Sequence, residues 1–325
     1  MPQITDPPPA DVAADLARVR QALDTVVPPR LGDNLLIATW NLRAFGSLTR
    51  KWHSGASDSP RRDLTSALCI AEIVSRFDVI AIQEVKADLR ALRDLLKKLG
   101  PNWSFALTDV TYGDPGNGER LAYLFDTTRV KLSGLACELV VPEDLDTPFS
   151  TPANAAAFQR QFVRTPYALS FLAGDQTFVL VTLHVIYGDK GEERRQELTA
   201  IAKWLRAWAE QEDDFGHNLI CLGDFNIDRR DDPQYQAFVS TGLTPAPGHM
   251  NLPRTVFSKA GKPELDSFFD QIAWFQTVKD KPYLTLAYRK GGNFDFRGLA
   301  MTDLTIQQLS FRISDHFPLW VEFGR

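Results

Sequence analysis

Seven short apolar runs between residues 35 and 323 constrain the fold of this chain more than any other feature of its sequence. Runs of this length predict strands that are buried on both faces of a sheet. The runs are LLIATW (35–40), DVIAIQ (78–83), LAYLF (121–125), TFVLVTLHV (177–185), NLICLGDF (218–225), FDQIAWF (269–275) and PLWVEF (318–323). Between them, apolar residues at helical spacing predict helices over Arg62–Arg76, Asp88–Leu99 and Glu192–Trp208. The pattern predicts an α/β protein in which helices cover packed sheets.

The domain organisation follows from what separates these runs. No internal repeat or linker divides residues 34–325, so we expect one domain there. Residues 1–33 are expected to form an arm, with a proline-rich tail over 1–10 and a short helix over 11–23. The helix would bury Val12, Leu16, Val19 and Leu23. Two polar insertions, residues 46–61 and 142–160, have the length of functional loops.

Composition excludes several classes of protein. Hydrophobic residues make up 44% of the chain and charged residues 24%, which excludes wholesale disorder and fibrous architectures. The longest strongly apolar stretch, 177–187, falls short of the roughly 20 residues that span a bilayer. Lys and Arg number 36 and Asp and Glu 41, a net charge of −5, so nucleic-acid binding would need a local basic patch.

The cysteines and the N-terminus bear on the compartment. Cys69, Cys137 and Cys221 are too few for a disulfide framework, and we expect reduced thiols within the core. The first residues lack the basic and apolar segments of a secretory signal. A cytoplasmic protein is therefore expected.

Polar residues that can carry chemistry follow the apolar runs, where buried strands end at one rim of a sheet. Each position alone has a structural explanation: Asn41 could cap a turn, Glu84 could start a helix, and Asp224 and Asn226 could form an Asx turn. Their repetition points to a functional rim instead. The positions are Asn41, Glu84, His184, Asp224, Asn226, Asp270, Asp315 and His316.

The oxygen-rich side chains of this set suit a hard cation such as Mg²⁺, with Mn²⁺ or Ca²⁺ as alternatives. Zinc is disfavoured because the sequence has no cysteine cluster and no His-Glu-x-x-His motif. A serine hydrolase is poorly supported because no Gly-x-Ser-x-Gly motif is present. Walker and dinucleotide-binding fingerprints are also missing.

An ordered set of motifs resembles the endonuclease/exonuclease/phosphatase superfamily, and within it most closely the pancreatic-type deoxyribonuclease I branch. Arg-x-Pro at 164–166 and GGNFDF at 291–296 support that branch. The resemblance implies a four-layered α/β sandwich, with two mixed β-sheets packed face to face and helices outside. The motifs are TWNLRAFG (39–46), FDVIAIQEV (77–85), GERLAYLF (118–125), VTLHV (181–185), LGDFN (222–226), FDQIA (269–273) and ISDHFPLWVEF (313–323).

The resemblance also implies roles for individual residues. Glu84 would be the principal metal-binding carboxylate, with Asn41 and Asp315 close by. Asp224 and Asn226 would hold the scissile phosphate and the nucleophile, or a second metal. Glu119 would pair with His184, and Asp270 with His316, which places two carboxylate-oriented histidines on opposite sides of the phosphate.

The chemistry of phosphodiester hydrolysis fits these roles. The reaction needs an activated water, neutralisation of developing charge and a proton for the leaving oxygen. We assign His316 as the base that activates water and His184 as the acid or phosphate-stabilising cation, although their roles could be exchanged. A histidine bonded to a backbone carbonyl in the core is the structural alternative for His184.

Two cations are expected to bind substrate phosphate. Arg164 resembles a position that grips a phosphate beside the scissile one, and a solvated surface charge is its alternative. Lys86 resembles a basic position in the substrate groove. Asn117 stands where deoxyribonucleases commonly carry an aromatic residue, which puts the family's minor-groove contact in doubt. The 46–61 insertion adds Arg50, Lys51, Trp52, His53 and Arg61, which could bind nucleic acid or belong to a surface loop.

The sequence thus predicts a divalent-metal-dependent deoxyribonuclease of low sequence specificity acting on double-stranded DNA, with no membrane and no evident protein partner. The first alternative keeps the catalytic core and exchanges the substrate for a phosphomonoester or a phospholipid headgroup. The second alternative is an inactive binding module. It is disfavoured because every matched catalytic position carries a competent residue.

Overall fold

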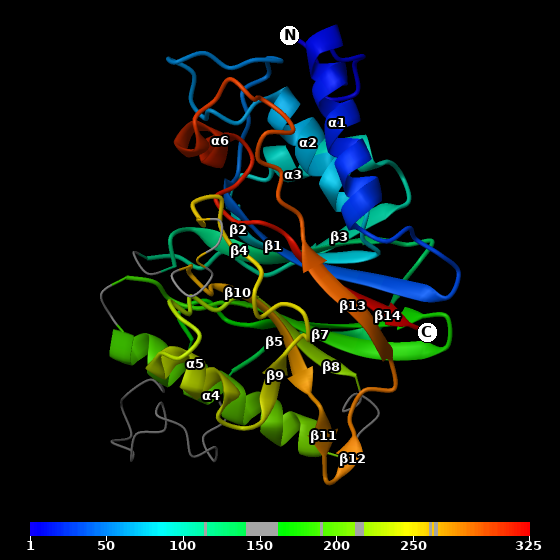
Figure 1. The fold of residues 1–325 in the computed structure, drawn as a ribbon, viewed down its shortest axis with the longest axis vertical. Coiled ribbons are helices and arrows are strands. Elements are labelled where there is room, and N and C mark those ends of the chain that lie inside the picture. The colour runs from blue at the N-terminus through cyan, green and yellow to red at the C-terminus, as the bar shows by residue number, and fades with distance from the viewer. Residues whose placement is uncertain (114–115, 141–161, 189–190, 212–217, 260–261, 263–265) are drawn as a thin grey trace.

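The computed structural model describes residues 1–113, 116–140, 162–188, 191–211, 218–259, 262 and 266–325 (Figure 1). The 142–160 insertion predicted from the sequence lies outside these residues.

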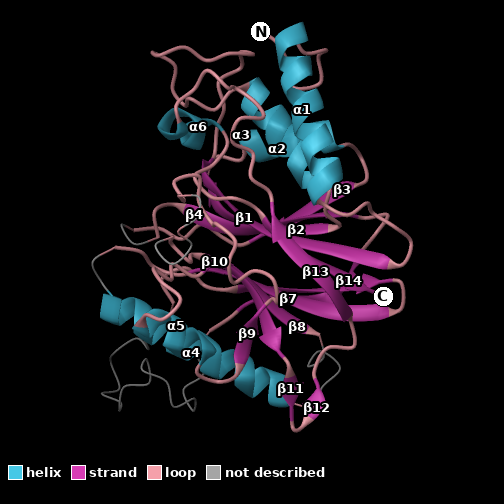
Figure 2. Cartoon of the chain, viewed as in Figure 1, coloured by secondary structure: helices cyan, strands magenta, loops and turns pink. Residues whose placement is uncertain are grey.

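Two six-stranded mixed sheets pack face to face between outer layers of helices (Figure 2). The first sheet has the order β13-β14-β1-β2-β4-β3 and the second β5-β6-β7-β8-β10-β9. The predicted four-layered α/β sandwich is confirmed. The strands of the first sheet are β1 (Asn34–Phe45), β2 (Val79–Lys86), β3 (Trp103–Leu107), β4 (Glu119–Asp126), β13 (Ala287–Asn293) and β14 (Leu319–Gly324). Those of the second are β5 (Lys131–Glu138), β6 (Tyr167–Ala173), β7 (Gln176–His184), β8 (Leu219–Asp224), β9 (Leu243–Pro245) and β10 (Asp270–Phe275).

The helices lie on the two outer faces of the sandwich (Figure 1). The outer face of the first sheet is covered by α1 (Ala10–Val26), α2 (Leu64–Val74), α3 (Arg90–Leu99) and α6 (Ile306–Arg312). The second sheet is covered by α4 (Gly191–Glu210) and α5 (Pro233–Val239). A small hairpin pairs β11 (Thr277–Val278) with β12 (Lys281–Pro282). Three helices predicted from apolar spacing are confirmed as α2, α3 and α4.

All seven predicted strands form, and two parallel pairs among them orient the molecule. β1 pairs in parallel with β2, and β7 pairs in parallel with β8. The remaining neighbours in both sheets are antiparallel. Carboxyl ends of parallel strands meet at one edge of a sheet, where ligands bind in α/β proteins. The two sheets therefore present two such edges, one from each layer.

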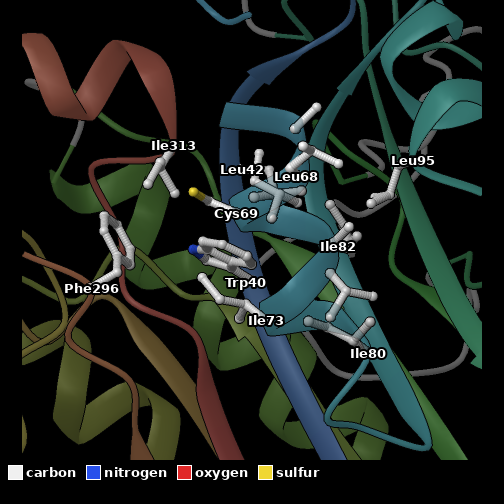
Figure 3. Packing of buried hydrophobic residues seen from close by; sticks show 14 of the residues in the cluster. Trp40, Leu42, Leu68, Cys69, Ile73, Ile80, Ile82, Leu95, Phe296 and Ile313 are labelled. Carbon is white, nitrogen blue, oxygen red and sulfur yellow. The ribbon is translucent and has the colours of Figure 1, made fainter. Parts of the chain in front are cut away.

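The core beneath the helices contacts this edge directly (Figure 3). Trp40 of β1 packs among Cys69 and Ile73 of α2, and its indole Nε1 donates a hydrogen bond to the His316 carbonyl at 2.8 Å. The start of α2 is fixed by the Asp63 carboxylate, which accepts from the Ser66 amide at 2.9 Å in a capping box. An apolar residue of β1 thus ties the helix layer to a predicted catalytic segment.

The N-terminal arm packs onto the first sheet's helices. α1 buries Val12, Leu16, Val19 and Leu23, as predicted, and these join the same apolar cluster as α2. The separation of residues 1–33 from the remainder stays a prediction. The three cysteines are free thiols: Cys69 and Cys221 are buried, whereas Cys137 lies half-buried on β5. Within the described parts of the chain, no helix combines the length and apolarity that a membrane crossing requires.

One buried arginine shapes the end of β1. Pairing of β1 with β2 shifts register after Asn41, where Arg43 and Ala44 have positive φ angles of 33° and 49°. The Arg62 side chain, 3% exposed, donates to five carbonyl oxygens at 2.8–3.1 Å. Three belong to residues 42–44 of this bulge, and two belong to residues 312–313, just before Asp315. Arg62 therefore clamps two site-bearing segments together.

Replacing Arg62 with Met should lower the free energy of unfolding by about 3–5 kcal/mol, because several buried carbonyl groups lose their donor. Arg62→Lys should recover only part of this loss, since one ammonium cannot reach the five oxygens that a guanidinium fork reaches. Urea unfolding followed by circular dichroism measures both. Arg90→Met is the matched control, because Arg90 is exposed and forms its ion pair, within the described residues, with Asp88, and it should cost less than about 1 kcal/mol. An unchanged urea midpoint for Arg62→Met would refute the clamp.

Candidate active site

The polar residues predicted to follow the strands meet at the shared edge of the two sheets. Asn41 and Glu84 come from β1 and β2, and His184 and Asp224 from β7 and β8. The antiparallel neighbours of β2 and β8 add one carboxylate each, because Glu119 begins β4 and Asp270 begins β10. Asp315 and His316 precede β14.

Asp224 lies at the centre of this cluster and is 1% exposed. Its Oδ2 accepts a hydrogen bond from Asn41 Nδ2 at 2.9 Å. The same oxygen lies 3.7 Å from His184 Nε2 and 3.9 Å from His316 Nε2. Its Oδ1 accepts from the Asn226 amide at 2.9 Å, and a positive φ of 50° at Asn226 accompanies this turn. Both histidines thus direct Nε2 toward one carboxylate oxygen.

Each histidine is held by a carboxylate from the opposite sheet. His184 Nδ1 lies 3.3 Å from Glu119 Oε2, which joins β7 of the second sheet to β4 of the first. His316 Nδ1 lies 2.6 Å from Asp270 Oδ2, which joins the first sheet to β10 of the second. These are the two pairs that the resemblance implied. A carboxylate at Nδ1 fixes the ring orientation and leaves Nε2 for substrate.

Burial and charge act in opposite directions on the His316–Asp270 pair. Burial alone would lower the pKa of His316, but the charge of Asp270 and its hydrogen bond outweigh burial and raise the pKa well above its ordinary value. Burial raises the pKa of Asp270 to about 6, although His316 lowers it. The charges of Asp224 and Asp315 also raise the pKa of His316. The protonation of His316 is therefore set by the carboxylates that surround it.

Glu119 gathers cationic side chains on the other side of Asp224. Lys86 Nζ donates to Glu119 Oε1 at 2.9 Å, and Arg164 Nε lies 2.9 Å from Oε2. Burial would raise the pKa of Glu119, but His184, Arg164 and Lys86 lower it to about 2. Asn117 also donates to this carboxylate, at 2.6 Å. Lys86 and Arg164 together carry two positive charges against one carboxylate, so this side of the site is suited to an anion.

Glu84 is held by the end of β1. Its Oε2 accepts from the Ala44 amide at 2.7 Å and its Oε1 from Asn41 Nδ2 at 3.1 Å. Glu84 has a positive φ of 61°, at the register shift between β2 and β4. Asp315 Oδ2 pairs with Arg43 Nη1 at 3.2 Å. The bulge at the end of β1 therefore supplies donors to both carboxylates.

The donor set fits a hard divalent cation, because the buried Asp224 and the half-buried Glu84 and Asp315 offer carboxylate oxygens. Among the described residues, the group of carboxylate and imidazole ligand atoms that lie within 4.8 Å of one another belongs to Asp224, Asp270 and His316, and does not include Glu84 or Asp315. Asp270 and His316 already bind each other there. The Asn41 amide turns its nitrogen toward Glu84 and Asp224, while its oxygen accepts from the Arg43 amide at 3.0 Å. Metal binding by Asn41 and Asp315 stays a prediction.

Sequence reasoning missed the side chains that support this cluster from beneath. Gln83 donates to Thr39 at 3.1 Å and to Thr182 at 2.9 Å, which links the two sheets under the site. Ser314 Oγ donates to the Asn41 carbonyl and accepts from the His316 amide. A glutamine at the end of an otherwise apolar run was the available signal for Gln83. Arg62 carried no comparable signal, because it directly follows the polar 46–61 insertion, where a charged residue at the start of a predicted helix is ordinary.

The basic residues of the 46–61 insertion mostly have partners inside the molecule. Trp52 packs against the helix-side core, and Arg61 donates to the Gly55 carbonyl at 2.8 Å. The remaining three form ion pairs at 2.8–2.9 Å: Arg50–Asp94, Lys51–Asp58 and His53–Asp11. Binding of nucleic acid by this insertion stays a prediction.

Comparison of the sequence with known proteins finds two curated relatives. A deoxyribonuclease from Thioalkalivibrio sp. (strain K90mix) is 27% identical over 210 residues, 63% of this chain and 50% of that protein. Deoxyribonuclease-1 from Bos taurus is 24% identical over 206 residues, 61% of this chain and 63% of that protein. The match thus spans half of the first curated relative and less than two thirds of the second.

Fold comparison extends the likeness over more of the chain. A mannosyl-6-phosphatase from Bacteroides thetaiotaomicron VPI-5482 shares the fold with a TM-score of 0.57 and 19% sequence identity, covering 90% of this chain and 100% of that one. Residues 38–278 match the model of the Endonuclease/Exonuclease/phosphatase family. The chain belongs to this family of hydrolases that act on phosphoester bonds.

Proposed function

We propose that this protein is a divalent-metal-dependent phosphodiesterase that hydrolyses DNA with little sequence specificity. The observation that carries the proposal is the pair of histidines, each held at Nδ1 by a carboxylate, whose Nε2 atoms face Asp224 from opposite sheets. Two curated relatives are named deoxyribonucleases, which supports DNA as the substrate.

The proposed mechanism divides the chemistry between the two histidines. Asp270 holds His316 so that a neutral Nε2 accepts a proton from the attacking water. His184, held by Glu119, donates a hydrogen bond to the phosphate or a proton to its leaving oxygen. Asp224 lies between the two Nε2 atoms, and Asp224 and Asn226 are proposed to position the water and the scissile phosphate. General acid–base catalysis of this kind increases the reaction rate by roughly 10²–10⁴-fold.

Glu84, Asp224, Asp315 and Asn41 are the residues proposed to hold Mg²⁺, with Mn²⁺ or Ca²⁺ as alternatives. When bound there, the cation would neutralise charge that develops on the phosphate oxygens and offset the carboxylates that raise the His316 pKa. Arg164 and Lys86 are proposed to bind a neighbouring phosphate, since together they exceed the charge of Glu119.

A second candidate retains this site and changes the substrate to a phosphomonoester or a phospholipid headgroup. The fold shared with a mannosyl-6-phosphatase favours the phosphomonoester as the substrate of this second candidate. The core residues would serve either substrate, so the loops around the site decide between them. Double-stranded DNA as the form of the substrate and a cytoplasmic location stay predictions.

The purified protein should convert supercoiled plasmid to open circles in Mg²⁺ or Mn²⁺, and EDTA should abolish the nicking. His316→Ala should lower the rate by at least about 100-fold, because the water loses its proton acceptor. Thr277→Ala is the control, since Thr277 is exposed on the β11–β12 hairpin, outside the catalytic cluster and the 46–61 insertion. If wild-type protein leaves plasmid intact but releases phosphate from small phosphomonoesters, the second candidate replaces the first.

Asp270→Asn should reduce kcat by about 10²–10⁴-fold with little change in KM, because an amide holds the His316 ring without stabilising its cation. Glu119→Gln should change KM as well as kcat, because Lys86 and Arg164 lose the carboxylate that positions them. Steady-state cleavage of a labelled oligonucleotide measures both constants. Asp175→Asn, in the exposed turn between β6 and β7, should match wild type. A kcat within threefold of wild type for Asp270→Asn would contradict the assigned pairing.

A further inference from the structure

A pocket of about 470 Å³ lies between the 46–61 insertion and α6, outside the cluster around Asp224. We propose that it binds an unpaired nucleotide of the DNA strand, next to the scissile phosphate. This inference rests on the proposed function and names the form of the substrate. The lining residues are Ala56, Arg61, Leu304, Gln307, Gln308, Phe311 and Arg312.

The two walls of the pocket are fixed to each other by a buried arginine. Arg312, at the end of α6, is 9% exposed and forms an ion pair with Asp63. Its Nη2 donates to the Ser54 carbonyl at 2.8 Å, and its Nη1 donates to the Ser54 hydroxyl. The insertion and the helix are therefore held in register, and the pocket does not have to form on binding. Its volume lies within the range of small-molecule sites.

The lining combines an apolar interior with a cation. Phe311 is 45% exposed although it is a large aromatic residue, and Leu304 and Ala56 add apolar surface. Arg61 contributes a guanidinium that, among the described residues, donates a hydrogen bond to the Gly55 carbonyl at 2.8 Å. An aromatic face beside a cation matches the two halves of a nucleotide, because the base stacks and the phosphate pairs with the charge.

One side chain connects this pocket to the reaction centre. Arg43 places its guanidinium 4.0 Å from the centre of the Phe311 ring. The same guanidinium contacts Asp315 Oδ2 at 3.2 Å and donates to Ser310 Oγ at 2.8 Å. Arg43 thus contacts both the pocket wall and a predicted metal ligand, so a strand on the phosphate site would pass the pocket with an adjacent nucleotide.

A base that stacks on Phe311 has to be unpaired and outside the DNA double helix. The pocket therefore favours a single strand, a gap or a frayed end over an intact duplex. The apolar surface of Phe311, Leu304 and Ala56 would pack against any base, so binding would tolerate different sequences.

Fluorescence anisotropy of labelled 12-mers tests the proposal without cleavage, in a His316→Ala background with Mg²⁺. Adding Phe311→Ala should raise the Kd for single-stranded DNA at least about fivefold and leave the Kd for a blunt duplex within about twofold. Ala56→Phe, which fills the pocket, should act in the same direction. Arg61→Gln should reduce the slope of log Kd against log salt by about one. Phe105→Ala is the matched control, since Phe105 is an exposed phenylalanine on β3 and does not line the pocket.

Three results would overturn the inference. An unchanged single-strand Kd for both Phe311→Ala and Ala56→Phe would remove the pocket from the binding site. Equal weakening of single-strand and duplex binding would show that the pocket does not select an unpaired base. In either case, plasmid nicking by wild-type protein would leave the proposed function standing. Absence of DNA binding together with absence of nicking would instead reject the proposed function, and the nucleotide pocket with it.

Discussion

Face-to-face packing of the two sheets sets the distances on which the site depends. Neither histidine has its carboxylate partner in its own sheet: Glu119 reaches His184 across the interface, and Asp270 reaches His316 in the reverse direction. A change in sheet separation of an ångström would open both pairs. The apolar layer between the sheets, with Tyr123, Phe171 and Leu180 fully buried, therefore determines hydrogen-bond geometry at the rim.

Hydrogen bonds between the layers reinforce this spacing. Tyr123 of β4 donates from its hydroxyl to the carbonyl groups of Tyr167 and Leu180 in the other sheet, at 3.0 and 2.9 Å. Gln83 joins Thr39 to Thr182 closer to the site. Buried polar groups of this kind lose free energy unless every partner is in place, so they favour one relative position of the sheets. Apolar contacts alone would permit the two sheets to slide past each other.

The sequence predicted the central strands and the fold because both depend on local hydrophobic pattern and on motif order. Runs such as DVIAIQ are buried on both faces, which leaves few alternatives to an interior strand. The edge strands were harder to predict. β5 alternates exposed and half-buried residues, and β13 contains Gly291 and Gly292, so neither presents an apolar run. Candidate catalytic residues could be identified because they follow predictable strands, whereas Arg62 acts through backbone carbonyls that only the folded chain brings together.

Several residues at the rim adopt left-handed backbone conformations that residues other than glycine ordinarily avoid. Glu84, Asn117 and Asn226 have φ angles of 61°, 55° and 50°, and each lies beside or within the catalytic cluster. Such conformations cost roughly 1 kcal/mol or more per residue, and the surrounding fold must supply that energy. The active edge therefore holds backbone strain. Selection for thermostability alone would favour glycine at these positions and would remove the side chains on which the chemistry depends, so stability and activity are opposed at the same residues.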